Sequence, residues 1–385
     1  MKILHVNYHD LRGGAAIAAF RLCRAQRVLG MDSRMLTVEK SSREPWVETV
    51  PPSDAVKMRF FQRAEHLLNL AGADRKNFLP HSLNLFPTGT VQAILKLAPD
   101  IVHLHWVNGN MLSLREIAQI PLPVVWTLHD TWAYCGSEHY HLLGDDRFIR
   151  GYDDRSLEGF VWRRKRKYWK KFSPVVVGPS AWIAGEARSS LLLGNCRIEH
   201  IFNGVDFGEF GRRPRGEARR RWGIPPEAKV IVVGAVSLGG RNKGGELLKE
   251  SLAAFPEAVV LALGGNVPAD LHKNTVRAGR IGDAETMALA YSAGDVFLSV
   301  ARYDNLPNML VESVACGTPV VAVDAGGVRE IVTPENGVVT PSKSDEITAA
   351  LRGVLYGENR FVPSAAKFDA AKTAAAYGEL YRSIL

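Results

Sequence analysis

The sequence predicts an α/β protein with two doubly wound parallel sheets, each in a domain of its own. Short runs rich in Val, Ile and Leu alternate with longer helical patterns through nearly all of the 385 residues. Several runs end in polar residues, which is typical of parallel strands that reach a binding site. The length corresponds to roughly two or three domains, and 46% hydrophobic residues are enough for more than one core.

The first half of the chain opens with a clear strand and helix. Residues 2–7 form an expected strand, 8–14 a loop and 15–29 an Ala-rich helix that Gly30 ends. Further strands are expected at residues 33–38, 101–106, 124–130 and 175–180. The last two of these end in polar residues, so they predict where a site lies on this sheet.

A second series of strands and helices follows a turn at Asn203-Gly204 and the Arg-rich stretch 211–223. Its expected strands are residues 230–236, 258–263, 296–300 and 319–323, and its expected helices are 244–253, 284–293, 308–316 and 345–355. We therefore expect an N-terminal domain over residues 1–205 and a C-terminal domain over 206–365. The last segment, 366–385, contains a helix that can cross back to the N-terminal domain.

Composition excludes several classes of protein. The chain has 48 Lys and Arg against 40 Asp and Glu, and its net charge of +8 favours anionic partners such as nucleotides, lipid headgroups or nucleic acid. The four cysteines form no CxxC pair, which argues against a zinc site or a disulfide framework. No apolar run has the pattern of a secretory signal or a spanning helix, so we expect a cytoplasmic protein, at most peripheral on the cytoplasmic membrane face.

The segment 300–322 carries the most chemistry. It has the pattern of a strand, a loop, a helix, a glycine stop and a strand, with Pro307 in the first helical turn. The amides of Asn308, Met309 and Leu310 would then be unpaired at the N-terminus of a helix. Such a terminus at the carboxyl end of a parallel strand is an anion site, so this turn predicts a phosphate.

Two carboxylates bracket this turn, Asp304 in the loop and Glu312 about one turn inside the helix. A carboxylate at the position of Glu312 can accept two hydroxyl hydrogens from a ribose or a sugar. The alternative is that Asp304 is an ordinary loop residue and Glu312 a solvated helix residue.

The pattern resembles the retaining glycosyltransferases of family 4, which have the GT-B fold. Their C-terminal domain carries Glu, seven residues and Glu, and then a helix ending in Ala-Cys-Gly-Thr-Pro-Val-Val, which this chain has at residues 315–321. The second acid matches Glu312, whereas the first is replaced by the shorter Asp304. The resemblance implies two Rossmann-like domains facing a cleft, with the acceptor on the N-terminal side and a nucleoside-diphosphate sugar on the C-terminal side.

Other positions match the same family. Gly13 and Gly14 match its glycine loop, beside the donor phosphate or the acceptor, although the pair alone is equally a simple turn. His129 follows an expected strand and matches a histidine beside the reacting sugar; a structural histidine is the alternative. Asp130 is a weaker candidate for orienting the acceptor.

The resemblance also assigns the donor side. Lys243 matches the basic element that holds the diphosphate, and Arg241 replaces the arginine that the family usually has after the preceding strand. Ordinary exposed loop charges are the alternative for both. The remaining expected donor contacts are Arg280, Ile281, Asn305, Asn308, Met309, Leu310 and Glu312.

The implied activity is transfer of a sugar, with retention of its anomeric configuration, to a hydroxyl of a glycan or lipid-linked acceptor. The family's proposed route needs no divalent metal, no further cofactor and no protein base, because the departing phosphate oxygen takes the acceptor proton. Three alternatives stay open: a GT-B nucleotide-sugar epimerase, a non-catalytic sugar-nucleotide binder and a basic nucleic-acid-binding protein. The nucleotide base, the sugar, the acceptor and the oligomeric state are not readable.

Two further patterns have competing interpretations. Residues 161–172 place aromatic side chains between seven cations on an expected helix, which fits either contact with an anionic membrane or aromatic packing under a solvated basic face. The pairs His103/His105 and His139/His141 suggest metal ligands, but we expect core or rim histidines and no metal. The sequence has no Gly-x-Ser-x-Gly turn and no P-loop, which argues against a hydrolase or a P-loop enzyme.

Overall fold

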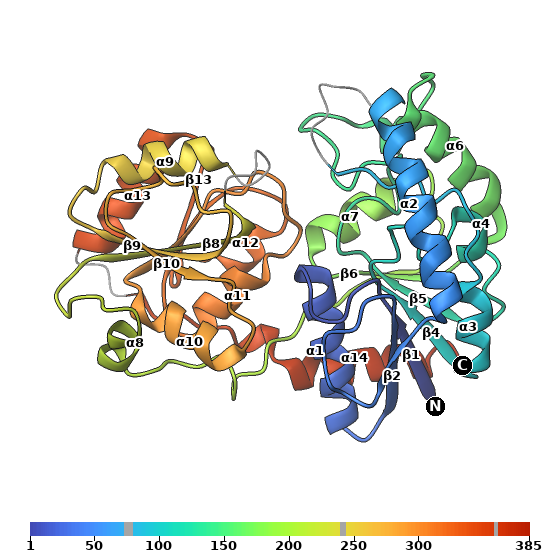
Figure 1. Ribbon diagram of the computed structural model, residues 1–385, viewed down its shortest axis with the longest axis horizontal. Coiled ribbons are helices and arrows are strands. Elements are labelled where there is room, and N and C mark those ends of the chain that lie inside the picture. Colours follow the sequence, from blue (N-terminus) through green and yellow to red (C-terminus); the bar gives the residue numbers. More distant parts are fainter. Residues whose placement is uncertain (73–79, 239–243, 358–360) are drawn as a thin grey trace. The chain divides into compact units, whose positions relative to one another are not determined.

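The structure is a computed structural model that describes residues 1–72, 80–238, 244–357 and 361–385. It confirms the expected α/β class, because helices alternate with the strands of two parallel sheets. The chain divides into two compact units, one made of Met1–Gly204 with Ala370–Leu385 and the other of Val205–Asp369. The chain therefore passes between the units twice (Figure 1), and each unit is described by itself.

The first unit is built on a seven-stranded sheet with the order β3-β2-β1-β4-β5-β6-β7. Its strands are β1 (Lys2–Val6), β2 (Asp32–Thr37), β3 (Val47–Thr49), β4 (Ile101–Leu104), β5 (Val124–Thr127), β6 (Val175–Gly178) and β7 (Ile198–His200). The chain order reverses between β1 and β4. In open α/β sheets a ligand binds outside the carboxyl ends of the strands at such a point.

Helices cover both faces of this sheet. They are α1 (Gly14–Val28), α2 (Pro52–Gly72), α3 (Thr90–Lys96), α4 (Leu114–Ile117), α5 (Arg147–Arg150), α6 (Leu157–Tyr168) with the 3-10 turn η1 (Trp169–Lys171), α7 (Ala181–Ser189) and α14 (Ala370–Arg382). Successive side chains of a strand point to opposite faces. Accordingly, Ile3 packs with α1 and α14 on one face, whereas Leu4 packs with α4 and α6 on the other.

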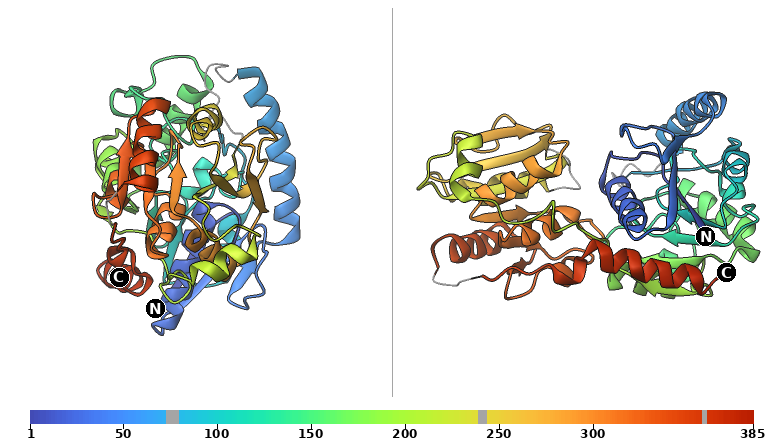
Figure 2. Two further views of the ribbon diagram at one scale, coloured as in Figure 1. Left: turned by 90° about the vertical axis from the view of Figure 1, so that its left-hand side faces the viewer. Right: turned by 90° about the horizontal axis from the view of Figure 1, so that it is seen from below.

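Helix α14 brings the end of the chain back to the first unit, where it lies beside α1 (Figures 1 and 2). Its Tyr377 and Tyr381 are fully buried, and its Gly378 lies against Met31. The core of the first unit is therefore completed by residues from both ends of the chain.

The second unit is built on a six-stranded parallel sheet with the order β10-β9-β8-β11-β12-β13. The strands are β8 (Val230–Ser237), β9 (Val259–Gly265), β10 (Thr275–Gly279), β11 (Val296–Ser299), β12 (Val320–Val323) and β13 (Gly337–Thr340). The helices are α8 (Arg215–Arg221), α9 (Gly245–Ala253), α10 (Ala284–Ala293), α11 (Asn308–Ala315), α12 (Val328–Ile331), α13 (Ser344–Tyr356) and the 3-10 turn η3 (Ala366–Phe368). Here the order reverses between β8 and β11, so a ligand is expected outside their carboxyl ends.

The main differences from the predicted elements lie at sheet edges and strand ends. The short edge strands β3 and β7 and the edge strands β10 and β13 were not predicted as strands. The expected strand 124–130 stops at Thr127, because the following residues leave the sheet and form part of the candidate site. None of the helices in the described ranges combines the length and hydrophobicity that crossing a membrane requires.

Candidate functional site

The candidate site of the second unit lies where β11 ends. The loop 300–307 leads from β11 into α11, which begins at Asn308. Asp304 lies in this loop, and its Oδ1 accepts a hydrogen bond from the backbone N–H of Asn305 at 3.0 Å. Asn305 is buried, and its carbonyl accepts from the N–H of Gly327 at 2.7 Å. The loop is therefore fixed by the turn that precedes α12.

One detail of the predicted anion site is wrong. The N–H of Leu310 donates to the carbonyl of Pro307 at 3.1 Å, so this amide is not unpaired. Pro307 is the N-cap of α11 rather than part of its first turn, and its carbonyl closes that turn in 3-10 fashion. A phosphate role for this helix therefore stays a prediction that does not include the Leu310 amide. The side chains of Met309 and Leu310 pack inward.

Glu312 lies one turn into α11 and is buried, with 4% of its surface exposed. Its Oε2 accepts a hydrogen bond from the hydroxyl of Tyr291, a fully buried residue of α10, at 2.7 Å. The alternative prediction of a solvated helix residue is therefore wrong. A carboxylate that has lost most of its water and is held by a neighbouring helix is oriented before any ligand arrives.

Of the remaining donor-side predictions, two fall on residues that the structure does not describe and two on residues that it does. Lys243 and Arg241 lie outside the described residues. Arg280 and Ile281 directly follow β10, the edge strand of the sheet, and Arg280 is exposed.

In the first unit, the predicted glycine pair connects β1 to α1. Gly13 is the N-cap of α1, with φ 93° and ψ 161°, and Gly14 is its first residue. A Cβ at Gly13 would meet no atom within 4 Å, so the backbone angle and not crowding calls for glycine there. The loop lies at the carboxyl end of β1, on the edge of the sheet where the chain order reverses.

His129 lies just beyond β5 on the same edge. It is half-buried, and its Nε2 is 3.0 Å from Nδ1 of His105. Burial lowers the pKa of His129 to about 4, although the neighbouring Asp130 opposes this shift. The imidazole is therefore neutral at neutral pH and acts as a hydrogen-bonding group. The adjoining cavity of ≈ 10 Å³ has room for about one water molecule and none for a sugar.

Asp130 is already engaged by protein groups. Its Oδ1 accepts from the backbone N–H of Trp132 at 3.0 Å, and its Oδ2 accepts from Trp106 Nε1 at 3.1 Å and lies 2.5 Å from His139 Nδ1. Burial on its own raises the pKa of Asp130, but His139 and the Trp132 N–H outweigh it and hold the pKa below the usual value. An acceptor hydroxyl would have to share the carboxylate with these donors.

Asp130, His139 and Ser82 are joined by hydrogen bonds in the order of the Asp-His-Ser triad of a hydrolase. His139 Nε2 is 2.8 Å from Ser82 Oγ, and His139 Nδ1 contacts Asp130. However, the N–H of Ser82 donates to Ser137 O at 2.8 Å, and the N–H of Leu83 donates to Glu65 Oε2 at 3.2 Å. These adjacent amides are therefore not aimed at an oxyanion. The hydrogen bonds from Ser82 through His139 instead fix the orientation of Asp130.

His5, His103 and His105 bring ligand atoms within 4.8 Å of one another in the core. Each of their six ring nitrogens is within 3.0 Å of a protein group, namely Gln26, Tyr381, Thr127, His129 or another histidine of the set. A metal ion would have to displace these hydrogen bonds. The arrangement is therefore better described as a hydrogen-bond network of core histidines.

Comparison with known families shows to which family this chain with its two candidate sites belongs. The family model described as "Glycosyltransferase Family 4" matches residues 12–209, more than half of the chain. The model described as "Glycosyl transferases group 1" matches residues 227–356, which include β11 and α11. The chain belongs to glycosyltransferase family 4.

Curated relatives of this glycosyltransferase are about a quarter identical to it over the aligned residues. The sulfoquinovosyl transferase SQD2 of Arabidopsis thaliana is 26% identical over 72% of this chain, which spans only 54% of the length of that relative. The D-inositol 3-phosphate glycosyltransferase of Corynebacterium urealyticum is 26% identical over 80% of this chain and 78% of its own.

Solved structures show the GT-B fold for this family 4 enzyme. The sucrose-phosphate synthase of Thermosynechococcus elongatus covers 100% of this chain and 99% of its own, with a TM-score of 0.70 and 18% identity. Alr3699/HepE of Anabaena, solved in complex with UDP-glucose, covers 100% of both chains with a TM-score of 0.66 and 16% identity. At these identities the likeness concerns the fold alone.

The basic segment 161–172 of the glycosyltransferase has its aromatic side chains inside. Trp162 and Trp169 are 2% and 4% exposed, and Lys165 is fully buried. The Nζ of Lys165 donates to the carbonyls of Cys135 at 3.1 Å and Gly136 at 2.6 Å, and to Trp132 O. The aromatic stripe therefore packs into the first unit. The exposed cations are Arg163, Arg166, Lys167, Lys170 and Lys171.

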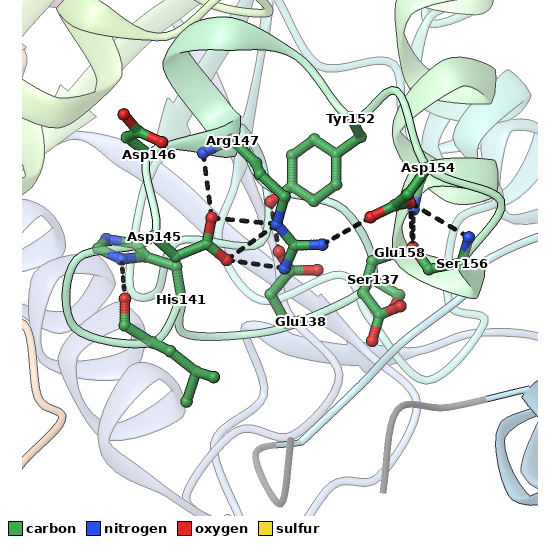
Figure 3. Close-up of polar contacts among 12 residues, drawn as sticks. Ser137, Glu138, His141, Asp145, Asp146, Arg147, Tyr152, Asp154, Ser156 and Glu158 are labelled. Carbon is green, nitrogen blue, oxygen red and sulfur yellow. Dashed lines mark hydrogen bonds and ion pairs between the residues drawn. The ribbon is translucent and has the colours of Figure 1, made fainter. Parts of the chain in front are cut away.

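A polar cluster after β5 was missed by sequence reasoning (Figure 3). Arg147 of α5 donates to Asp145 at 2.7 Å and to Asp154 at 3.2 Å, and its guanidinium lies over the ring of Tyr152. The hydroxyl of Tyr152 donates to the buried carboxylate of Glu138. These contacts brace the loop that follows the site residues His129 and Asp130, and no short spacing in the sequence predicts them.

Sequence reasoning also missed the exposed apolar side of α2. Val56, Phe60, Leu67 and Leu70 are each more than 60% exposed and recur at helical spacing. Basic side chains of the same helix, Arg59 and Arg63, line a surface depression beside Leu67. The 3.6-residue period of these positions is a signal that could have identified this surface.

Proposed function

We propose that this glycosyltransferase transfers a hexosyl group from a nucleoside-diphosphate sugar to a hydroxyl of a glycan or lipid-linked acceptor, with retention of configuration and without a divalent metal. The observation that carries the proposal is the end of β11. There α11 begins four residues after Asp304, and the buried Glu312, one turn into that helix, is held by Tyr291. A helix terminus for a diphosphate and a carboxylate for a ribose fit a nucleotide sugar.

In this proposal the leaving group is the diphosphate, and stabilising its growing charge is the main catalytic effect. The first turn of α11 supplies a fixed positive potential there, and Lys243 and Arg241 would add the positive charges of their side chains. We assign Glu312 to the ribose hydroxyls, Asp304 and His129 to the donor sugar, and Gly13-Gly14 to the phosphate or acceptor side. The acceptor proton goes to the departing phosphate oxygen, so no side chain is assigned as a base.

The relatives support the substrate class. The Anabaena structures were solved with UDP-glucose and UDP, and a neighbouring starch synthase was solved with ADP and acarbose. Two other relatives are named as a putative colanic acid biosynthesis glycosyl transferase and as a GDP-mannose-dependent phosphatidylinositol dimannoside mannosyltransferase. The nucleotides named for these proteins therefore differ in their base.

A lipid-linked acceptor would place the enzyme at the cytoplasmic face of a membrane. The five exposed cations of segment 161–172 would then meet anionic headgroups by charge alone, because its tryptophans are buried. Replacing Lys167, Lys170 and Lys171 by Gln should reduce co-sedimentation with anionic vesicles, and the loss should disappear at high salt. Unchanged co-sedimentation would remove segment 161–172 from the contact.

The other candidate functions have less support. Three of the six arginines of the stretch 211–223 are paired within the second unit, since Arg213 pairs with Glu285, and Arg215 and Arg219 pair with Asp295. Only part of this stretch is therefore available as a basic surface for nucleic acid. A non-catalytic donor binder differs from the proposed enzyme only in turnover, which the experiment below measures.

The proposal is tested in two steps. Thermal unfolding is first measured with UDP, GDP, ADP and TDP and their sugar conjugates, with and without EDTA. One nucleotide should raise the Tm selectively and equally in EDTA, and its sugar conjugate is then used in transfer assays with Lys243→Ala as the deficient variant. If no nucleotide at millimolar concentration raises the Tm, the proposed donor site is contradicted. If a nucleotide sugar binds but no sugar is transferred, the proposed enzymatic activity is contradicted. If Lys243→Ala transfers sugar at the normal rate, the proposed role of Lys243 in holding the diphosphate is contradicted.

A further inference from the structure

A chain of hydrogen bonds runs through the core of the first unit from α1 to His129. Gln26 Oε1 lies 2.8 Å from His5 Nε2, His5 Nδ1 lies 2.9 Å from His105 Nε2, and His105 Nδ1 lies 3.0 Å from His129 Nε2. Gln26, His5 and His105 are at most 4% exposed. Only the last member, His129, is partly exposed at the edge of the sheet.

The register of the sheet builds this chain. β1 and β4 pair so that His5 lies opposite His103, and His105 follows β4 directly. The histidine side chains point to the face covered by α1 and α14, where Gln26 of α1 and Tyr381 of α14 receive them. The chain therefore leads from the middle of the sheet to the carboxyl edge, where a ligand is expected.

The contacts give the chain a direction. The Nε2 amide of Gln26 donates to the hydroxyl of Tyr381 at 3.1 Å, so its Oε1 is the atom that faces His5. A carbonyl oxygen only accepts, and therefore His5 carries its proton on Nε2. Burial lowers the pKa of His5 to about 4, so this ring is neutral at neutral pH and its Nδ1 carries a lone pair.

The same argument passes along the chain. Since His5 Nδ1 accepts, His105 must donate from Nε2, which leaves a lone pair on His105 Nδ1. His129 must then donate from Nε2, which leaves its Nδ1 as an acceptor. Burial also holds the pKa values of His105 and His129 below the usual value, so the neutral forms required here are the ones present at neutral pH.

A second branch agrees with this orientation of Gln26. The hydroxyl of Tyr381 accepts from Gln26 and so donates to His103 Nδ1 at 2.6 Å. His103 Nε2 then donates to Thr127 Oγ1 at 2.7 Å, and this hydroxyl lies 2.7 Å from that of Tyr377. From Gln26 to His103 each donor of the branch therefore meets an acceptor, as buried polar groups require.

We propose that Gln26 is a positioning residue that, through His5 and His105, holds His129 in the Nε2-protonated tautomer, so that its Nδ1 accepts a hydrogen bond from a hydroxyl of the transferred sugar. The contact with the sugar rests on the proposed function, whereas the tautomer does not. An apolar residue at position 26 would leave the Nε2–H of His5 buried without an acceptor, which is more costly than leaving a lone pair unpaired. Reversal of all hydrogen bonds between His5, His105 and His129 then lowers the free energy, and His129 becomes protonated on Nδ1.

Long-range ¹H–¹⁵N NMR spectra of the full chain test the tautomer directly. At pH 7.5 the wild type should show His129 protonated on Nε2 alone, and Gln26→Met should give a substantial Nδ1-protonated population. Gln26→Glu, which keeps a carbonyl-type acceptor, should retain the wild-type tautomer. Tyr377→Phe is the matched control, because it removes a buried hydroxyl from the other branch. A wild-type His129 protonated on Nδ1, or an unchanged tautomer in Gln26→Met, would overturn the proposal.

Transfer kinetics test the contact with the sugar. Gln26→Met should lower kcat/KM roughly two- to tenfold, the effect of one hydrogen bond. Gln26→Glu and Tyr377→Phe should stay near wild type. A changed tautomer with unchanged kinetics would overturn the role toward the sugar. If the wild type transfers no sugar at all, the proposed function fails while the NMR result still decides whether Gln26 sets the tautomer.

Discussion

Glu312 and Tyr291 form a buried pair contributed by two neighbouring helices, and the carboxylate is the half that has a ligand role in our proposal. The tyrosine hydroxyl occupies one carboxylate oxygen and removes rotational freedom from the side chain. In our proposal a ribose would therefore meet an acceptor that is already desolvated and oriented, which strengthens each hydrogen bond that it makes.

Glu312→Gln should raise the KM for the donor about tenfold and leave the fold intact, because the amide can still accept from Tyr291 but lacks the charge that strengthens the ribose contacts. Donor titrations of kcat and KM measure this, with Tyr291→Phe as the comparison variant. Tyr291→Phe should lose about 1 kcal/mol of stability and show a smaller change in KM. Equal KM values for Glu312→Gln and the wild type would exclude a ribose contact.

Single residues also show where sequence reasoning ends. Asp304, Glu312 and His129 were selected because each lies at a fixed distance from a strand end or a helix start. Their partners were not, because Tyr291 lies 21 positions before Glu312, and Gln26 reaches His129 only through His5 on β1 and His105 just after β4. Which side chains meet depends on strand register and helix rotation, which spacing alone leaves open.

Among the elements, the loop 300–307 is held in place by a glycine of another loop. Gly326 has φ 52°, and a Cβ built on it would lie 1.9 Å from the carbonyl oxygen of Asp304. The close approach of these two backbones sets the position of Asp304 relative to α11. The conformation of the loop 300–307 therefore depends on the backbone at Gly326 as well as on the loop's own residues.

Gly326→Ala should displace the loop, raise the KM for the donor and lower stability by more than 1 kcal/mol. The matched control is Gly223→Ala, since Gly223 also has a positive φ of 64° but no atom within 4 Å of its Cβ position. That variant should show the backbone strain of about 1 kcal/mol and normal kinetics. Similar kinetics for the two variants would mean that the clash with Asp304 has no consequence for the site.

Helix α6 depends on Lys165, which lies inside the protein, and burial lowers the pKa of this lysine to about 7. Lys165→Met should destabilise the first unit by about 3 kcal/mol, because the carbonyls of Trp132, Cys135 and Gly136 would lose their shared donor. Lys167→Met, on the exposed side of the same helix, should change stability by less than about 0.5 kcal/mol. Urea unfolding compares them, and a small loss for Lys165→Met would show that water replaces the ammonium.

The predicted elements were right where hydrophobic runs are long and flanked by turn residues, as at residues 230–236 and 296–300. They failed for β3 and β7, which have three residues each and lie at sheet edges, where a run is too short for its period to be visible. The strand 124–130 was drawn too long because the apolar pattern continues through Leu128 although pairing stops at Thr127.

For the whole molecule, the histidine network predicts how stability changes with pH. The pKa of His5 is about 4 in the folded protein and near 6.5 in the unfolded chain, because burial opposes its charge. The unfolded chain therefore binds the extra proton first as pH falls. This contribution is complete above pH 6.5 and is lost progressively between pH 6.5 and pH 4, at about 3 kcal/mol for a single such histidine.

Urea unfolding between pH 8 and pH 4.5 should accordingly show falling stability below pH 6.5. Tryptophan fluorescence reports the first unit, since every tryptophan except Trp222 lies there. The raised pKa of His141, beside Glu186, acts in the opposite direction, but it is outnumbered by His5, His103, His105 and His129. Stability that stays constant down to pH 5 would contradict a neutral network.

The return of α14 has a consequence for how the protein is made. The ribosome synthesises the other described helices and strands of the first unit before it adds Tyr377 and Tyr381 of α14, whose hydroxyls close the histidine network. All strands of the second unit are synthesised before them. We therefore expect the order of folding during translation to be inverted: the second unit can fold while its neighbour still waits for its final helix. A nascent chain that stops before residue 370 would leave one apolar face of the first sheet exposed. Until α14 has been synthesised and packed, this face is therefore available to chaperones and proteases.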